Sequence, residues 1–392
     1  MHRKRIMFIF GTRPEAIKMA PLVSEVKKHS DIFVPIVAVT GQHREMLEQA
    51  LKPFGVKPDY DMDIMEPNQT LSSIVSKTLH GFESIVVQER PHIVLVQGDT
   101  STTFAASLAS FYKKIPVGHI EAGLRTWKKF NPFPEEMNRK LTTALADIHF
   151  APTMTSVQNL EKEGIHRSSI YLTGNTVIDA LLAVADKPFD LKKVGVNIKP
   201  GKKVILVTTH RRESFGQPMR NTCEAVAKIA KKFGDEVSII LPMHKNPAVR
   251  DVINEALEDV REVQLIEPLD YVPFVHLMKA SHLILTDSGG VQEEAPSLGK
   301  PVLVLREVTE RPEAVEANTV KVVGTDPGVI YRESEKLLSD KKAYDAMARS
   351  VNPYGDGRAS ERITGVLLKY FGFTDRGIEE FDFDRLSKTA AQ

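Results

Sequence analysis

Short apolar, β-branched segments alternate with longer amphipathic segments through most of the chain. In the first part the apolar segments are residues 5–10, 33–39, 92–98, 115–120 and 147–152. Helical patterns lie between them, at residues 14–29, 69–89, 101–113 and 134–146. This alternation predicts buried strands and covering helices, and it is typical of a parallel sheet with helices on both faces.

The same pattern starts again at "KKVILVTTH" (202–210). Its later apolar segments are residues 237–243, 263–268, 282–287, 301–307 and 319–324. Between the two series, residues 181–201 lose periodicity and gain Lys, Pro and Gly, as linkers do. We therefore predict two α/β domains, residues 1–175 and 176–355, with helices in 356–392 returning to the first. Ligands of open parallel sheets bind at the carboxyl ends of the strands, so both domains are expected to face one cleft.

Length and composition agree with a two-domain globular protein. A chain of 392 residues exceeds the size at which one core keeps growing. The 52 basic and 51 acidic residues nearly balance, so the bulk charge indicates neither nucleic-acid nor membrane binding. The single cysteine, Cys223, excludes an internal disulfide and a multi-cysteine metal site.

No targeting or membrane segment is expected. The apolar run at the start ends after five residues at Gly11, which is too short for a signal peptide. No segment approaches the roughly 20 apolar residues of a membrane span. We therefore expect a cytoplasmic protein.

The first strand leads into "FGTRPEAIKMAP" (10–21), which predicts a capped helix. Thr12 with Glu15 three residues later forms a capping-box pattern. Neither a GxGxxG nor a GxxxxGK[ST] motif is present, so dinucleotide and P-loop binding are not indicated. Arg13 and Lys18 add cations near the helix start. Taken alone, they fit phosphate binding and solvated surface charges equally well.

Three carboxylates follow strands of the first domain in consecutive βα connections. Asp99 and Glu121 stand just beyond apolar segments, and Glu135 starts a helix on which Arg139 lies one turn later. One such acid is usually a solvated surface group. Three together favour a functional site, because paired carboxylates allow acid and base roles.

Two segments of the second domain indicate an anionic sugar ligand. In "LTDSGGVQEEAPSLG" (285–299), two glycines precede a helix start, where bare N–H groups suit phosphate, and Glu294 suits sugar hydroxyls. His210 follows a strand with Arg211 and Arg212, and a charged surface loop is the alternative explanation. His210 is too isolated to indicate a metal site.

Taken together, these residues resemble the non-hydrolysing UDP-N-acetylglucosamine 2-epimerases of bacteria and archaea. The resemblance runs from about residue 5 to about residue 371. It rests on "FGTRPEAIKMAPL", "GQHREML", "HIEAGLRT", "PEEMNR", "TGNTVIDAL", "HRRESFG", "LTDSGGVQEEAPSLGKPVLVLRE", "TERPEAV" and "NPYGDG". It implies a glycosyltransferase-B-like fold of two Rossmann-like, doubly wound domains facing a central cleft.

The implied reaction converts UDP-GlcNAc to UDP-ManNAc by eliminating UDP to 2-acetamidoglucal and adding it back. No metal or other cofactor is expected, and a homodimer without nucleic-acid or membrane partners is implied, in cell-surface polysaccharide precursor synthesis. By resemblance, Asp99, Glu121 and Glu135 are the acid/base set beside Arg139. His210 is grouped with the catalytic residues, and it would hold UDP together with Arg13, Lys18, Ser288, Gly289 and Gly290. Glu294 would bind the ribose and Phe274 would lie near uracil, although Phe274 alone is better explained by packing.

Some family members bind a second UDP-GlcNAc that activates them. The residues associated with that site are Gln42, His43 and His244 in this chain. By itself, His244 is better explained as a packing residue. Asn68 stands where some members have Arg before "QTL". Loss of that cation predicts weak activation.

Three other functions share parts of this pattern. A glycosyltransferase would need an acceptor site and would not explain the three acids. A non-catalytic nucleotide-sugar sensor would have no use for Asp99, Glu121 and Glu135 together. A hydrolysing epimerase would release free ManNAc and UDP, and only the closeness of the non-hydrolysing match separates it.

Overall fold

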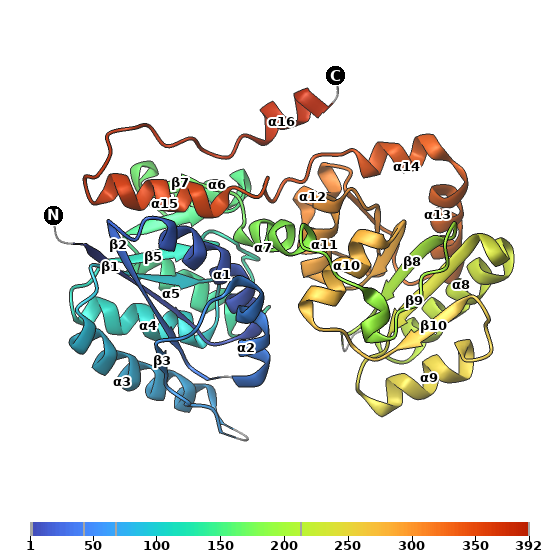
Figure 1. The fold of residues 1–392 in the computed structure, drawn as a ribbon, viewed down its shortest axis with the longest axis horizontal. Coiled ribbons are helices and arrows are strands. Elements are labelled where there is room, and N and C mark those ends of the chain that lie inside the picture. Colours follow the sequence, from blue (N-terminus) through green and yellow to red (C-terminus); the bar gives the residue numbers. More distant parts are fainter. Residues whose placement is uncertain (1–2, 42–43, 67–68, 212–213, 391–392) are drawn as a thin grey trace. The chain divides into compact units, whose positions relative to one another are not determined.

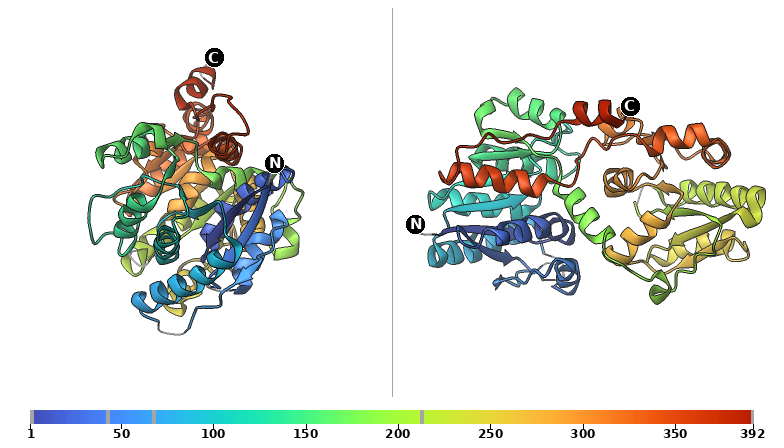
Figure 2. Two further views of the ribbon diagram at one scale, coloured as in Figure 1. Left: turned by 90° about the vertical axis from the view of Figure 1, so that its left-hand side faces the viewer. Right: turned by 45° about the horizontal axis from the view of Figure 1, so that its top comes forward.

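The computed structural model describes residues 3–41, 44–66, 69–211 and 214–390. The chain forms two compact units (Figures 1 and 2). Unit 1 comprises Met1–Ala180 and Tyr354–Phe381, and unit 2 comprises Leu181–Pro353 and the residues from Asp382 onward. The boundary was expected near residue 175 and the whole of 356–392 was expected on the first domain. Instead, the last helix groups with unit 2.

Unit 1 is built on a seven-stranded parallel sheet with the order β3-β2-β1-β4-β5-β6-β7. Its strands are β1 (Lys4–Phe10), β2 (Phe33–Val39), β3 (Tyr60–Asp61), β4 (Ile93–Gln97), β5 (Val117–Ile120), β6 (Ile148–Ala151) and β7 (Ile170–Leu172). Its helices are α1 (Arg13–Lys28), α2 (Arg44–Leu51), α3 (Leu71–Glu89), α4 (Ser101–Tyr112), α5 (Glu135–Leu145), α6 (Met154–Lys162), α7 (Thr176–Ala185) and α15 (Ala359–Tyr370). Helix α7 runs across the boundary between the units.

Unit 2 has a six-stranded parallel sheet with the order β10-β9-β8-β11-β12-β13. Its strands are β8 (Lys203–Thr208), β9 (Val237–Pro242), β10 (Val263–Ile266), β11 (Leu283–Thr286), β12 (Val302–Val304) and β13 (Val320–Val322). Its helices are α8 (Gln217–Phe233), α9 (Pro247–Leu257), α10 (Tyr271–Ala280), α11 (Gly289–Glu294), α12 (Pro312–Glu316), α13 (Pro327–Ser339), α14 (Lys341–Ala348) and α16 (Phe383–Ala390).

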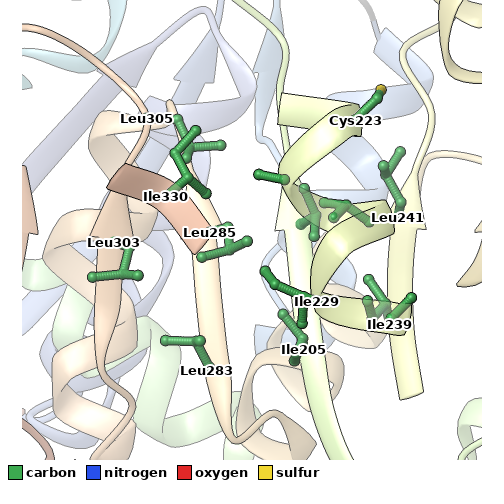
Figure 3. Packing of buried hydrophobic residues seen from close by; sticks show 14 of the residues in the cluster. Ile205, Cys223, Ile229, Ile239, Leu241, Leu283, Leu285, Leu303, Leu305 and Ile330 are labelled. Atoms are coloured by element: carbon green, nitrogen blue, oxygen red, sulfur yellow. The ribbon is translucent and has the colours of Figure 1, made fainter. Parts of the chain in front are cut away.

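Each sheet is buried by helices on both faces. In unit 1, α1 packs against α2 and α15, while α3, α4 and α5 pack in a row. In unit 2, α8 packs against α9 and α13. Figure 3 shows the core of unit 2. Side chains of three neighbouring strands pack there against Ile229 of α8 and Ile330 of α13; they are Ile205, Leu283 and Leu303. The strands are nearly continuous apolar runs because both of their faces are covered.

The two parallel-sheet α/β domains confirm the predicted fold class. All eleven apolar segments of the sequence contain strands. The short strands β3 and β7 were not predicted, and the expected linker contains the end of α7 and a short 3-10 turn at Leu191–Val194. None of the helices in the described ranges is long and apolar enough to cross a membrane.

Candidate functional site

The strand order of each sheet reverses at one place, and such switch points are where open α/β sheets bind ligands. In unit 1 the reversal lies between β1 and β4, and in unit 2 between β8 and β11. The register aligns the strand ends: Gln97 of β4 pairs with Ile120 of β5, and Thr208 of β8 pairs with Thr286 of β11. Residues that follow these strands therefore lie along one edge of each sheet.

The buried carboxylate of Glu15 joins two helix starts at the switch point of unit 1. It completes the expected capping box with Thr12, accepting the backbone N–H of Gly11 at 3.0 Å and of Thr12 at 2.7 Å. It also accepts the hydroxyl of Thr100, which caps α4, at 2.8 Å. Arg13 occupies the first position of α1 and is half-buried. The two helix N-termini and the Arg13 guanidinium make this edge favourable for an anion.

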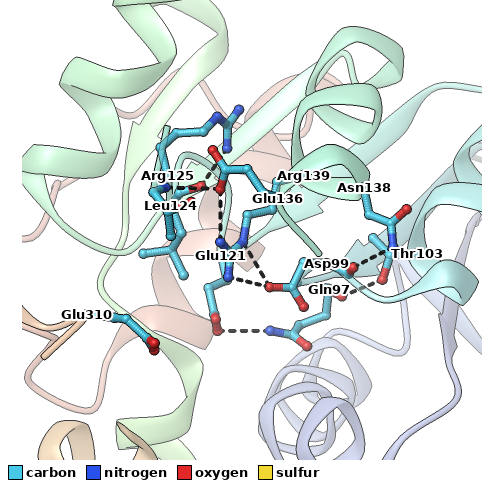
Figure 4. A network of polar contacts seen from close by, with 12 residues as sticks. Gln97, Asp99, Thr103, Glu121, Leu124, Arg125, Glu136, Asn138, Arg139 and Glu310 are labelled. Atoms are coloured by element: carbon cyan, nitrogen blue, oxygen red, sulfur yellow. Dashed lines mark hydrogen bonds and ion pairs between the residues drawn. The ribbon is translucent and has the colours of Figure 1, made fainter. Parts of the chain in front are cut away.

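Glu121 follows β5 and is held by three donors. Its Oε2 atom pairs with Lys18 Nζ and accepts hydrogen bonds from Gln97 Nε2 at 2.9 Å and Asn175 Nδ2 at 3.3 Å. Figure 4 shows the bond from Gln97. Glu121 has a backbone φ of 64°, which is uncommon for a residue with a side chain and often found at functional sites. The three donors hold the carboxylate in one orientation.

Asp99 follows β4 and binds Arg139 of α5. The Nε and Nη2 atoms of Arg139 lie 2.9 and 2.7 Å from Asp99 Oδ2, and Asn138 Nδ2 donates to the backbone carbonyl of Asp99 at 2.9 Å (Figure 4). Asp99 and Glu121, predicted from their strand ends, thus lie at the ends of adjacent strands, each with its own cation. Such an arrangement can transfer protons at two points of one ligand.

The partner of Arg139 within α5 is Glu136, not Glu135. Arg139 Nη1 lies 3.2 Å from Glu136 Oε2, and the carboxylate of Glu136 also accepts the backbone N–H groups of Thr126 and Trp127, both at 3.0 Å. Burial raises the pKa of Glu136, but these hydrogen bonds and Arg139 outweigh it and hold the pKa below its ordinary value. Glu135 is half-buried and makes no ion pair with any residue that the structure describes. Glu136 is therefore a structural anion, and Glu135 is the more accessible of the two.

The imidazole nearest to Glu121 in sequence is structural. His119 is fully buried, its Nε2 lies 2.7 Å from the carbonyl oxygen of Gly98, and burial lowers its pKa to about 3. It is neutral at physiological pH and cannot serve as an acid there. His119 is therefore not a candidate acid, and the carboxylates of Asp99 and Glu121 remain the candidates in this part of unit 1.

In unit 2, the buried Asp287 organises the loop that carries His210. Its carboxylate accepts the backbone N–H of His210 at 3.0 Å, that of Arg211 at 3.0 Å and the Ser214 hydroxyl at 2.6 Å. The imidazole Nδ1 of His210 lies 3.2 Å from Asp287 Oδ1. Burial raises the pKa of Asp287, but the bonds from His210, Ser214 and Arg211 hold it below its ordinary value. The ionised Asp287 fixes the direction of the half-exposed His210 ring.

A pocket of about 350 Å³ lies at this switch point. Its lining includes four residues predicted from the sequence, His210, His244, Phe274 and Ser288. The remaining lining residues are Thr208, Thr209, Pro242, Met243, Lys245, Pro268, Leu269 and Val291. An apolar pocket with a few polar groups at its rim, of this volume, suits a small organic ligand.

Helix α11 starts beside the pocket. Ser288 caps it by accepting the N–H of Val291, and Gly289 and Gly290 form its first two positions. A side chain at Gly289 would lie about 3.5 Å from the guanidinium groups of Arg211 and Arg311, so both cations border this turn. Arg311 is tied to the buried Glu293, and Glu294 is also buried. The turn is therefore bordered by two guanidinium groups, which pair with the carboxylates of Glu293 and Glu310.

Some expected residues cannot be placed. Gln42 and His43, assigned to a second substrate site, lie outside the described residues, as do Asn68 and Arg212. His244 lines the pocket, and its ring lies 5.6 Å from that of Phe215. Within the ranges that the structure describes, no group of three or more His, Cys, Asp or Glu residues could hold a metal ion.

Comparison with known proteins identifies the family. A model of the family described as UDP-N-acetylglucosamine 2-epimerase matches residues 24–368. The chain belongs to this family. Among relatives in the UDP-N-acetylglucosamine 2-epimerase family, a protein of that name from Escherichia coli K12 is 54% identical over 370 residues, which are 93% of this chain and 98% of the relative.

This chain also aligns with two further members of the family over almost the whole length of each. A UDP-N-acetylglucosamine 2-epimerase of Bacillus subtilis is 50% identical over 384 residues, 97% of this chain and 99% of the relative. A crystal structure of UDP-GlcNAc 2-epimerase from Neisseria meningitidis bound to UDP-GlcNAc has a TM-score of 0.82 and 49% identity. It covers 93% of this chain and 100% of that chain.

Several site residues of this epimerase-family chain escaped the sequence analysis. Gln97 and Asn175 bind Glu121, Asp287 orients His210, and Arg311 borders Gly289. Asn175 and Arg311 lie inside motifs that carried the resemblance, "TGNTVIDAL" and "TERPEAV". Asp287 could have been noticed as an acid directly after an apolar strand, as Asp99 was.

Proposed function

We propose that the chain interconverts UDP-GlcNAc and UDP-ManNAc by eliminating UDP across C1 and C2 and adding it back. The observation that carries this proposal is the pair of carboxylates, Asp99 and Glu121, at the ends of adjacent strands, each bound to a cation. A sugar whose C2 configuration inverts must lose a proton on one face and gain one on the other. Two separately held carboxylates meet that requirement.

Unit 2 supplies features suited to the nucleotide. Phe274 and the apolar lining of the pocket fit a flat base, while Ser288, His210 and Arg211 offer donors for phosphate oxygens. The Neisseria relative, at 49% identity, was crystallised with UDP-GlcNAc. We assign UDP to this pocket, with Glu294 directed to the ribose hydroxyls.

The chemistry begins with departure of the diphosphate. The C2 proton has no adjacent ketone to acidify it, so a base alone removes it slowly. When the C1–O bond breaks, the electron pair leaves with UDP and positive charge develops at C1. Cations and N–H groups placed at the leaving oxygen stabilise this transition state. In unit 1, Arg13 occupies the first position of α1, and Lys18 of the same helix pairs with Glu121.

A carboxylate then takes the C2 proton, and the double bond of 2-acetamidoglucal forms between C1 and C2. Protonation at C2 on the opposite face and attack of a UDP oxygen at C1 complete the reaction, with every atom returned. By microscopic reversibility, the group that acts as base in one direction is the acid in the other. Asp99 and Glu121 fill these two roles, and Glu135 is the third acid of the set.

Incubation with UDP-GlcNAc in deuterated water, followed by proton NMR, tests the proposal. Deuterium should appear at C2 of both UDP-GlcNAc and UDP-ManNAc, without added NAD or metal. Free ManNAc and UDP as the main products would assign the chain to the hydrolysing class. Unchanged UDP-GlcNAc with no deuterium at C2 would refute epimerisation by this chain.

A further inference from the structure

Asn175, which directly precedes α7, is buried beside the Glu121 carboxylate. Its Nδ2 lies 3.3 Å from Glu121 Oε2, although the two residues are 54 positions apart in the sequence. We propose that Asn175 is a positioning residue: it sets the orientation of the Glu121 carboxylate for proton transfer at C2. This inference rests on the proposed function and adds a residue to it.

The orientation of the Asn175 amide follows from its other bonds. Its Oδ1 accepts the backbone N–H of Val177 at 3.0 Å, which is the bond that an N-cap residue makes at a helix start. A backbone N–H can only donate, so the oxygen must face Val177 and the NH₂ group must face Glu121. The amide is therefore an obligatory donor to the carboxylate of Glu121.

Three donors share one oxygen of Glu121. Lys18, Gln97 and Asn175 all bind Oε2, and they come from α1, β4 and the start of α7. Oε1 has no hydrogen-bond partner among the described residues. This division leaves Oε1 as the oxygen that faces the sugar, while Oε2 anchors the side chain. Removing one donor allows the carboxylate to rotate, so the rate of proton transfer by Glu121 should fall.

The returning C-terminal segment holds Asn175 in place. The backbone N–H of Asn175 donates to the carbonyl oxygen of Tyr354 at 2.7 Å. Gly174 has a φ of 83°, and a side chain there would come within 3.3 Å of Gly355 Cα, so the two backbones pack directly. The carboxylate of Asp179 accepts the N–H groups at the start of α15, including that of Ser360 at 2.7 Å. The backbone of Asn175 is thus fixed by packing and by hydrogen bonds.

Two substitutions separate positioning from folding. Asn175→Asp keeps the size and the N-cap acceptor but replaces the donor with a second negative charge. Asn175→Ser keeps a hydroxyl that can cap α7 but cannot reach Glu121. Both residues are good N-caps, so the melting temperature of Asn175→Ser should change little, whereas the second buried charge should lower that of Asn175→Asp. Loss of a hydrogen bond to a charged group should lower kcat on the order of 10- to 100-fold for Ser, and further for Asp.

The measurements are kcat and KM for epimerisation of UDP-GlcNAc, UDP affinity by calorimetry, and the melting temperature. We expect kcat to fall while KM and UDP affinity stay within about threefold, because the step affected is proton transfer. Thr153→Ala, which removes the cap of α6 in the same unit, should lower the melting temperature without lowering kcat.

The outcomes are distinct. Wild-type kcat in Asn175→Asp, or a fall in kcat matched by equal losses of UDP affinity and melting temperature, would overturn the positioning role. Should Asn175→Asp fail to fold, wild-type kcat in Asn175→Ser would overturn it in the same way. A wild-type protein that introduces no deuterium at C2 would overturn the proposed function as well, whereas normal exchange in all variants overturns this inference alone.

Discussion

The replacement Asp287→Asn should weaken UDP binding without changing the pocket lining. Asp287 is buried at the end of β11, and its partners all belong to the loop after β8. An asparagine of the same size can place its single side-chain oxygen where Asp287 Oδ2 accepts the two backbone N–H groups. It loses the charge and places an NH₂ group beside the His210 imidazole. The loop that aims His210 is therefore held less firmly.

The magnitude follows from the three donors that reach Oδ2. They are the amides of His210 and Arg211, both at 3.0 Å, and the Ser214 hydroxyl at 2.6 Å. A hydrogen bond to an ionised group contributes about 1.5–3 kcal/mol and one between neutral groups about 0.5–1.5 kcal/mol. Loss of the charge thus costs roughly 1 kcal/mol per bond, or about 3 kcal/mol for the loop. Part of this cost relaxes in the free protein, so UDP affinity should fall roughly 10- to 100-fold.

Isothermal titration calorimetry with UDP measures this change. Asp326→Asn is the matched control, because Asp326 caps α13 in the same unit and asparagine caps equally well. Its UDP affinity should equal that of the wild type. If Asp287→Asn binds UDP as tightly as Asp326→Asn, the loop does not depend on the charge of Asp287 and the argument fails.

Three further predictions concern the carboxylates of unit 1. Asp99→Asn and Glu121→Gln should each lower turnover on the order of 10²-fold or more, while UDP affinity measured by calorimetry is unchanged. If either variant keeps near-normal turnover, the residue replaced in it is not catalytic. Glu136→Gln should lower the free energy of unfolding by about 2 kcal/mol, because its charge holds two backbone N–H groups, whereas Glu135→Gln should not. Equal denaturant midpoints for these two variants would contradict the structural role of Glu136. Burial raises the pKa of Asp179 to about 6 against the hydrogen bonds from α15, so its ionisation disfavours the folded state. As pH rises from about 4 to 7, wild-type stability should therefore fall on the order of 3 kcal/mol relative to Asp179→Asn, and parallel stability–pH curves would show that the pKa is not raised.

The pattern of apolar segments predicted the fold well because both sheets are parallel and fully covered. Their strands are uninterrupted apolar runs, and helices of ordinary length separate them. The two missed strands, β3 and β7, have two and three residues and lie at the sheet edges. Such short edge strands form because a neighbouring strand offers free backbone groups. Their own sequence carries no periodic signal.

The sequence predicted those site residues whose location depends only on their position directly after a strand. Asp99 and Glu121 follow apolar strands, and the register of β4 and β5 brings them to one edge. The choice between Glu135 and Glu136 depends on how α5 is rotated, which is set by the distant backbone of Thr126 and Trp127. Contacts such as Asn175 with Glu121 arise only when distant segments meet in the fold, so no local pattern indicates them.

The measurement that tests elimination of UDP most directly uses UDP-GlcNAc carrying ¹⁸O in the bond between C1 and the β-phosphorus. If the C1–O bond breaks, the terminal phosphate of the released UDP can rotate before it adds back. The ¹⁸O label should then appear in non-bridging positions of the recovered UDP-GlcNAc and UDP-ManNAc, as ³¹P NMR would show. Deuterium at C2 together with ¹⁸O that stays in the bridging position would contradict the account, because the proton would then exchange without departure of UDP.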